Sequence, residues 1–173
     1  MRESIVLFFI VLMVACQPID PNLDYKSGKE VFEQYDLLDE PRKTAYSDTV
    51  YVPIYSDIYS ETKHVKFLLT ATLSIRNTSL KDSIYISRID YYDTFGNLVQ
   101  QYLTKQLLLK PMQSIEYVVD EKDNTGGTGA NFIIYWGSDT NKPQPIFEGI
   151  MISTNGQQGI SFSTQGVSIR SSP

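Results

Sequence analysis

The stretch that decides the fold is residues 66–76, which read KFLLTATLSIR. Apolar side chains occupy every second position over most of its length: Leu69, Ala71, Leu73 and Ile75. The positions between them are polar: Thr70, Thr72, Ser74 and Arg76. Because successive side chains of a β-strand point to opposite faces, this alternation predicts a strand with one face in a core and the other toward solvent.

Short segments of the same kind follow one another from residue 49 onward, separated by turn-forming residues. Further strands are predicted at residues 50–55, 83–92, 98–103, 114–119, 131–136, 147–153, 159–163 and 167–169. Residues 107–109, which precede Pro111, are expected to be a connecting edge segment. The 12 tyrosines of the chain also favour strands. With no long helical pattern between these segments, we expect residues 46–173 to form an all-β domain. The expected architecture is an antiparallel immunoglobulin-like β-sandwich, and the alternative is a small β-barrel.

The start of the chain has the layout of an export signal. Arg2 precedes an apolar run from Ile5 to Val14, and Ala15 stands directly before Cys16. The run has about half of the ~20 residues that a spanning helix needs. A small residue followed by cysteine is typical of a bacterial lipoprotein signal, in which the peptide is cut before the cysteine. We therefore expect residues 1–15 to be the signal and Cys16 to carry the lipid that reaches the membrane. The alternative is an ordinary cleaved signal in which Cys16 is incidental.

Residues 16–45 differ from the rest and are interpreted as a tether between the lipid and the domain. Pro18 and Pro21 break regular structure, and residues 29–38 have the apolar spacing of a short helix. Gln17 follows the cysteine in place of Asp, which by resemblance to lipoproteins of Gram-negative bacteria favours the outer membrane. The expected location is therefore the bacterial cell envelope, with the protein lipid-anchored.

Charge and cysteine content narrow the classes of function. The formal net charge is −5 and the sequence has no basic block, which argues against a nucleic-acid partner. Cys16 is the single cysteine of the chain, so the domain cannot contain an internal disulfide. We expect its fold to be held by its core alone.

A glycine-rich loop is the sharpest local feature before the strand predicted at residues 131–136. Its candidate binding residues are Gly126, Gly127, Gly129 and Asn131. Successive glycine N–H groups can form a concave anion site. A phosphate loop, however, needs a helix after it and usually a lysine, whereas a strand follows here. Sharp turning and close packing therefore explain these glycines better than anion binding does.

Two groups of titratable residues were weighed for metal binding or catalysis. The acidic cluster Asp120, Glu121 and Asp123 matches no defined calcium loop. His64 is the single histidine, which excludes a multi-histidine metal site, and no motif marks a nucleophile. We therefore expect no metal and no cofactor, and we assign no catalytic residue.

Tyrosines provide the main support for a binding role. A candidate binding surface consists of Tyr51, Tyr55, Tyr91 and Tyr92. Tyrosine combines apolar area with a hydroxyl group and therefore suits recognition surfaces. The alternative is that many of these rings fill the core of the sandwich or its rim.

Five segments together carry a resemblance to a known family: YVPIYS (51–56), LSIRNT (73–78), DYYDTFGNLV (90–99), GGTGANF (126–132) and GQQGISF (156–162). The chain resembles the bacterial domain of unknown function 3124 family over roughly residues 51–169. The resemblance implies a secreted or lipid-anchored envelope protein, and it supplies no activity, cofactor or catalytic residue. The segment around Asn77 is also similar, more weakly, to the sandwich domain of plant water-stress proteins, an analogy that concerns fold alone.

Three functions from different classes are compatible with these observations. The preferred one is a non-catalytic binding module for an envelope protein or glycan. The second is an envelope hydrolase with its site near the glycine-rich loop, which requires His64, Asp120 or Asp123 to meet that loop in one cleft. The third is a structural or stress-related sandwich without a dedicated ligand.

The lipoprotein signal predicts that the chain takes up fatty acid at Cys16. Cells that express the protein and are fed radioactive fatty acid should yield a labelled band. Cys16→Ser should abolish the label, because serine offers no thiol for acylation. An unlabelled wild-type protein, or equal label on the variant, would show that the assignment is wrong.

Overall fold

The computed structural model of the chain describes residues 35–154 and 159–172. Cys16, the predicted signal and most of the predicted helix lie outside these residues. At the end of the predicted helix, the structure instead has the short strand β1 (Asp36–Leu37), which pairs antiparallel with β8 (Leu107–Leu109).

The larger of two main sheets is built around the central strand β10 (Asn131–Ser138). Its other members are β1, β8, β2 (Tyr46–Pro53), β6 (Ile84–Tyr92), β7 (Leu98–Gln101) and β13 (Val167–Ser172). The strand order is β1-β8-β6-β10-β2-β13, and β7 pairs with β6 beside this path. β10 pairs antiparallel with β2 on one side and with β6 on the other.

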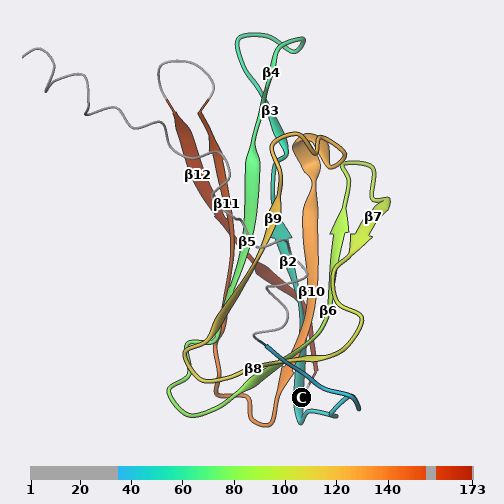
Figure 1. Ribbon diagram of the computed structural model, residues 1–173, viewed down its shortest axis with the longest axis vertical. Coiled ribbons are helices and arrows are strands. Elements are labelled where there is room, and N and C mark those ends of the chain that lie inside the picture. The colour runs from blue at the N-terminus through green and yellow to red at the C-terminus, as the bar shows by residue number, and fades with distance from the viewer. Residues whose placement is uncertain (1–34, 155–158, 173) are drawn as a thin grey trace, which may run out of the picture. The chain divides into compact units, whose positions relative to one another are not determined.

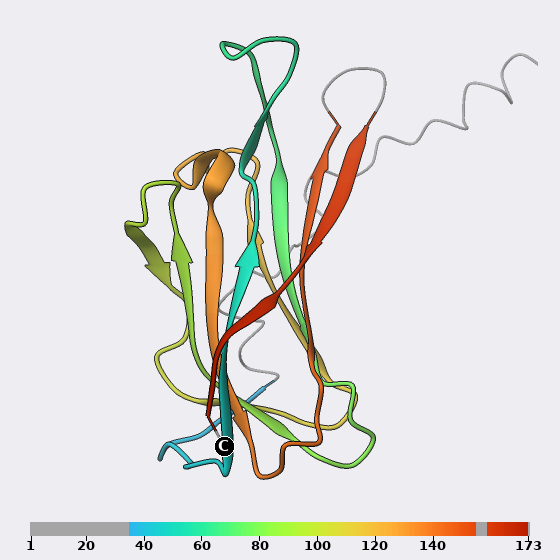
Figure 2. The same cartoon turned by 180° about the vertical axis from the view of Figure 1, so that it is seen from behind.

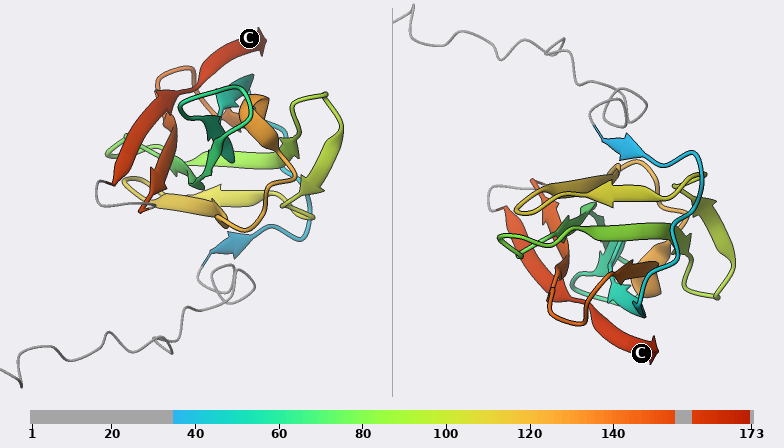
Figure 3. Two further views of the ribbon diagram at one scale, coloured as in Figure 1. Left: turned by 90° about the horizontal axis from the view of Figure 1, so that it is seen from above. Right: turned by 90° about the horizontal axis from the view of Figure 1, so that it is seen from below.

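The smaller main sheet has the order β12-β11-β5-β9. It contains β5 (Thr70–Arg76), β9 (Ser114–Val119), β11 (Ile146–Ser153) and β12 (Ile160–Gln165), all paired antiparallel. A separate hairpin is made by β3 (Asp57–Tyr59) and β4 (Lys66–Leu68). The two main sheets form the two layers of the domain (Figures 1 and 3). The predicted all-β antiparallel sandwich is therefore confirmed, and its strands do not close into one barrel.

The stretch at residues 66–76 provides the buried face that was predicted, but as two strands instead of one. Leu69, Ala71, Leu73 and Ile75 are all fully buried. The strand breaks at Leu69, whose N–H donates to the carbonyl of Ser56 (2.9 Å). Before the break the chain pairs with β3, and after it β5 lies between β11 and β9.

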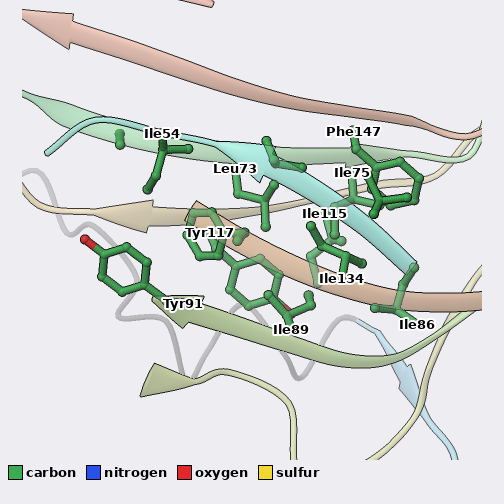
Figure 4. Packing of buried hydrophobic residues seen from close by; sticks show 14 of the residues in the cluster. Ile54, Leu73, Ile75, Ile86, Ile89, Tyr91, Ile115, Tyr117, Ile134 and Phe147 are labelled. Atoms are coloured by element: carbon green, nitrogen blue, oxygen red, sulfur yellow. The ribbon is translucent and has the colours of Figure 1, made fainter. Parts of the chain in front are cut away.

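The core lies between the two main sheets and draws side chains from both (Figure 4). The smaller sheet contributes Leu73, Ile75, Ile115 and Phe147, and the larger contributes Ile86, Ile89 and Ile134. Full burial of one such side chain stabilises a fold by about 1.5–3 kcal/mol. Because no disulfide is available, this inter-sheet packing carries the stability of the domain.

Asn77 joins three parts of the chain at one end of the sandwich. Its side-chain amide donates to the carbonyls of Asp82 (2.9 Å), Leu109 (3.1 Å) and Lys110 (3.0 Å). Its side-chain oxygen accepts the N–H of Ser79 (3.0 Å). The buried Asn77 therefore satisfies backbone groups where β5, β6 and β8 begin or end.

The segment that precedes β2 packs against the larger sheet. The guanidinium of Arg42 lies 5.3 Å from the ring centroid of Tyr85 and forms an ion pair with Asp139 (2.9 Å). The amide side chain of Gln106 accepts the N–H of Arg42 (2.7 Å) and donates to its carbonyl (3.2 Å). Part of the predicted tether thus contacts one end of the sheet's outer face.

Gly166 lies where the chain passes from the smaller sheet to the larger one. β12 pairs with β11, whereas β13 pairs with β2, and Figure 2 shows the chain crossing between them. The N–H of Gly166 donates to the carbonyl of Phe147 (2.8 Å). A Cβ at this position would lie 2.6 Å from Cγ1 of Val50 and 2.9 Å from Cβ of Phe147. Only glycine lets the two sheets approach this closely at the crossing.

Gly166→Ala should therefore destabilise the domain by about 1–3 kcal/mol, because the added methyl overpacks the core. Gly159→Ala is the matched control, because its Cβ would meet only the carbonyl oxygen of Ser153 at 3.5 Å. The control should change the free energy of unfolding by less than about 0.5 kcal/mol. Urea denaturation of both variants measures the difference, and equal stabilities would contradict the assigned role of Gly166.

Candidate functional site

The glycine-rich loop is held by hydrogen bonds from its own amides to hydroxyl groups of the protein. The loop contains the 3-10 turn η1 (Gly127–Gly129). The N–H of Gly127 donates to Oγ of Ser56 (2.7 Å), and the N–H of Gly129 donates to Oγ1 of Thr94 (2.9 Å). The backbone N–H and the hydroxyl of Thr94 both donate to the carbonyl of Gly126 (2.8 Å each). These amides are therefore engaged within the protein, as the packing explanation of the glycines predicts.

Gly127 is required at its position for two separate reasons. Its φ is +75°, in the left-handed region that side chains other than glycine rarely adopt. A Cβ there would also lie 2.6 Å from Oγ1 of Thr94. The loop thus joins β10 to the turn at residues 93–97 and to Ser56.

The acidic cluster before the loop stabilises a turn. Oδ1 of Asp123 accepts the N–H (3.1 Å) and the hydroxyl (2.5 Å) of Thr125, and the N–H of Asp123 donates to the carbonyl of Asp120 (2.9 Å). Within residues 35–154 and 159–172, no group of three or more His, Cys, Asp or Glu residues is placed to hold a metal ion.

His64 lies in the exposed turn between β3 and β4. Its backbone N–H donates to Oγ1 of Thr62 (3.2 Å). The hairpin of β3 and β4 extends beyond the loop that contains η1 (Figures 1 and 2). The structure therefore does not gather His64 with the glycine-rich loop in the way that the hydrolase hypothesis requires.

The four candidate tyrosines do not form one surface. Tyr91 is fully buried and stacks on Phe132, with ring centroids 5.2 Å apart. Its assignment to a binding surface was wrong, because Tyr91 and Tyr92 are neighbours in β6 and so point to opposite faces. Burial first and Asp123 second raise the pKa of Tyr91, and Ser56, Thr125 and Gly126 oppose this change. Tyr55 packs edge-on against Phe162 of β12, with centroids 5.7 Å apart.

Tyr51 and Tyr92 do share the outer face of the larger sheet, and the register adds a third tyrosine to them. Three rows of side chains run across β2, β10 and β6 on this face. The middle row is Tyr51, Ile133 and Asp90. The row on one side of it is Thr49, Tyr135 and Arg88, and the row on the other side is Pro53, Asn131 and Tyr92. We call this patch the tyrosine face. It consists of Thr49, Tyr51, Pro53, Arg88, Asp90, Tyr92, Asn131, Ile133 and Tyr135.

An ion pair lies within the tyrosine face. Nε of Arg88 lies 2.7 Å from Oδ2 and 2.8 Å from Oδ1 of Asp90. The Asp90 side chain is 0% exposed, whereas 43% of the Arg88 side chain is exposed. The guanidinium also lies 5.7 Å from the ring centroid of Tyr135. Asp90 therefore fixes the position of a charged, partly exposed donor beside an aromatic ring.

Two pKa shifts reflect this geometry. The hydrogen bond to Asp90 raises the pKa of the Arg88 guanidinium. Burial, followed by the Asp90 carboxylate, raises the pKa of Tyr92. Both side chains are thus held in their protonated states, as hydrogen-bond donors.

The sequence analysis missed six residues of the tyrosine face: Thr49, Pro53, Arg88, Asp90, Ile133 and Tyr135. Strand periodicity could have placed Tyr135 on the outer face, because it alternates with Ile134 and Trp136. Phe132, Ile134 and Trp136 are all buried in the structure. Nothing in the sequence indicated that Arg88 lies beside Tyr135. Their pairing depends on a register shift between β10 and β6 at the step from Tyr135 to Trp136.

A family model for proteins of unknown function, DUF3124, matches residues 47–169. The chain belongs to this family. The DUF3124 region thus includes nearly all of the sandwich, both faces of β10 and the glycine-rich loop. The predicted family membership is confirmed.

The chain is also similar to a solved structure. The crystal structure of Thermotoga maritima 1070 is 15% identical in sequence, with a TM-score of 0.39. The similarity covers 69% of this chain and 92% of that one. No curated protein matches the chain. In the part of the DUF3124 chain that the structure describes, no helix has the length and apolar character to cross a membrane.

The hydroxyl of Thr94 should control the opening of the glycine-rich loop. Thr94→Val keeps the shape of the side chain but removes the acceptor of the exposed Gly129 N–H, at a cost of about 0.5–1.5 kcal/mol. Hydrogen exchange at the Gly129 amide should therefore become roughly 2- to 10-fold faster. Thr94→Ser retains the hydroxyl and should exchange at close to the wild-type rate. Unchanged exchange in the valine variant would refute the role of Thr94.

Proposed function

We propose that this protein is a lipid-anchored component of the bacterial envelope whose sandwich binds a glycan through the tyrosine face, without chemistry. The tyrosine face is the observation that carries this proposal. The lipoprotein signal pattern supports an anchor at Cys16, and Gln17 in place of Asp after the cysteine supports a position on the outer membrane.

The composition of the tyrosine face suits a sugar ligand. The partly exposed rings of Tyr51, Tyr92 and Tyr135 offer flat apolar surfaces to the C–H faces of sugar rings. In the register of the sheet, Arg88 is paired with Tyr135 and Asn131 with Tyr92. The Arg88 guanidinium and the side-chain amide of Asn131 can hydrogen-bond sugar hydroxyls beside these rings. A glycan presents both kinds of surface along its length.

The size of the face favours a glycan over a folded protein. Three strands about 4.8 Å apart and three rows about 6.8 Å apart span roughly 10 by 14 Å. A stable protein partner needs about 800 Å² from each side, which is several times this area. A chain of sugar units can instead be bound across the rows.

The central position of β10 makes the face rigid before any ligand binds. β10 is paired along its whole length with both β2 and β6. Asp90 further restricts Arg88, so little side-chain freedom is lost on binding. This preorganisation compensates for the small contact area.

The wild-type protein should sediment with purified peptidoglycan sacculi, or migrate more slowly in native gels that contain a soluble envelope polysaccharide. Tyr135→Ala should weaken the binding about 5- to 30-fold, since loss of one aromatic anchor costs about 1–2 kcal/mol. Tyr59→Ala is the matched control, because Tyr59 is 55% exposed but lies in the β3–β4 hairpin. It should bind like the wild type.

Two outcomes would contradict the proposal. Equal loss of binding in both variants would place the contact outside the tyrosine face. If no glycan binds while photocrosslinkers at Tyr135 capture an envelope protein in intact cells, the partner is a protein instead.

A further inference from the structure

A hollow extends the tyrosine face toward the edge strand β13. It has a volume of about 250 Å³, and its lining includes Ser47, Thr49, Ser87, Tyr135 and Arg170. The register explains why the face and the hollow are continuous, because Arg170 pairs with Thr49 on the side of β2 away from Tyr135. Arg170 therefore extends one row of the tyrosine face across a fourth strand. A ligand on the face can thus place a side group in this hollow.

Arg170 presents an exposed positive charge to the hollow. It forms no ion pair with any acidic residue in the part of the chain that the structure describes. A guanidinium has five N–H donors in a planar fork, which matches the two oxygens of a carboxylate or phosphate group. Its donors are therefore available to an oxyanion on a ligand.

The carboxylates of this surface are withdrawn from solvent. Asp48 also lines the hollow, but it is 9% exposed and its Oδ1 atom already accepts two hydrogen bonds of 2.7 Å. Asp90 is 0% exposed and is paired with Arg88. Among the residues of the tyrosine face and the hollow, the charged groups that solvent reaches are thus the guanidinium groups of Arg88 and Arg170. The chain as a whole has a formal net charge of −5, so these groups make this surface the complement of an anion.

Hydroxyl groups complete the lining beside Arg170. Ser47 and Ser87 are exposed, and Thr49 is partly exposed. Ser87 is the extra residue of β6 at the register shift between β6 and β10, and its hydroxyl donates to the carbonyl of Tyr135 (3.1 Å). The Ser87 oxygen can still accept a hydrogen bond from a ligand. A ligand with both hydroxyl groups and an acidic group therefore finds partners for both kinds of group in one hollow.

We propose that the glycan bound by the tyrosine face is acidic, and that Arg170 binds its carboxylate or phosphate group in the hollow. The sugar ring that carries this group lies against Tyr135, and Arg88 donates to the glycan on the other side of that ring. This inference rests on the proposed glycan binding and adds the chemical class of the ligand. Because most of an acidic protein repels an acidic glycan, the two guanidinium groups also select the face on which the glycan binds.

Two pairs of polymers test the acidic group while keeping the sugar backbone. Polygalacturonate is compared with its carboxyl-reduced form, and dextran phosphate is compared with dextran. Affinity electrophoresis in native gels gives a dissociation constant for each polymer. The wild-type protein should bind at least one acidic polymer about 10-fold more tightly than its neutral partner, because hydrogen bonds to charged groups are the stronger ones. The pair that shows the difference identifies which oxyanion is recognised.

Arg170→Gln removes the charge while keeping a side-chain amide. This variant should bind the acidic polymer about 5- to 10-fold more weakly than the wild type, and the neutral polymer within about 2-fold of it. Arg76→Gln is the matched control, because 52% of the Arg76 side chain is exposed and it lies in β5 of the smaller sheet. It should bind both polymers like the wild type. Urea denaturation checks that each variant is folded.

Failure of this inference and failure of the glycan proposal give different results. If a neutral polymer or the sacculi bind in a Tyr135-dependent way and neither acidic polymer binds better, this inference is overturned and glycan binding stands. It is also overturned if folded Arg170→Gln binds the acidic polymer unchanged. If neither the polymers nor the sacculi bind, both proposals fail. If Arg170→Gln does not fold, the comparison of each acidic polymer with its neutral partner on the wild-type protein decides the question.

Discussion

Packing between the inner faces of the two sheets is the interaction on which the rest of this structure depends. One cysteine in the whole chain leaves no possibility of an internal disulfide across the sandwich. Large side chains from both sheets, such as Leu73 and Ile134, are fully buried between them. At Gly166 the chain itself crosses from one sheet to the other, which fixes how close β12 and β13 bring the layers. The outer faces contribute little to this packing, so their side chains are not restricted to apolar residues that fill the core.

Most of the fold followed from the alternation of apolar and polar side chains. β9 has the predicted bounds, and β5 has the predicted buried face. Residues 107–109, expected to be a connecting edge segment, form the strand β8, which pairs with β1 and β6. The break at Leu69 was not visible in the pattern, because it arises from pairing with the separate hairpin around β3. β1 and β3 contain two and three residues, so they are too short for any periodicity and exist only through their partners.

The sites were harder to predict than the fold, for reasons that differ from residue to residue. Tyr91 was misplaced although strand periodicity alone separates it from Tyr92. Arg88 meets Tyr135 only because β6 contains an extra residue opposite the Tyr135–Trp136 step, and such a bulge leaves no clear mark in the sequence. Tyr46, Phe147 and Ser168 line one cavity, although Tyr46 is more than a hundred positions from both of the others along the chain. Only the completed sandwich brings them together.

The tyrosine face is centred on β10, and its arrangement follows from the two faces of that strand. Tyr135 lies on the outer face, whereas its neighbour Trp136 lies on the inner face and packs in the core. A slip of one residue in register would exchange the two side chains and disrupt the tyrosine face and the core at once. β10 is the most thoroughly constrained strand for this purpose, since β2 and β6 pair with it over its full length. Side chains on such a strand are held in position without a ligand, which is what the proposed glycan binding requires.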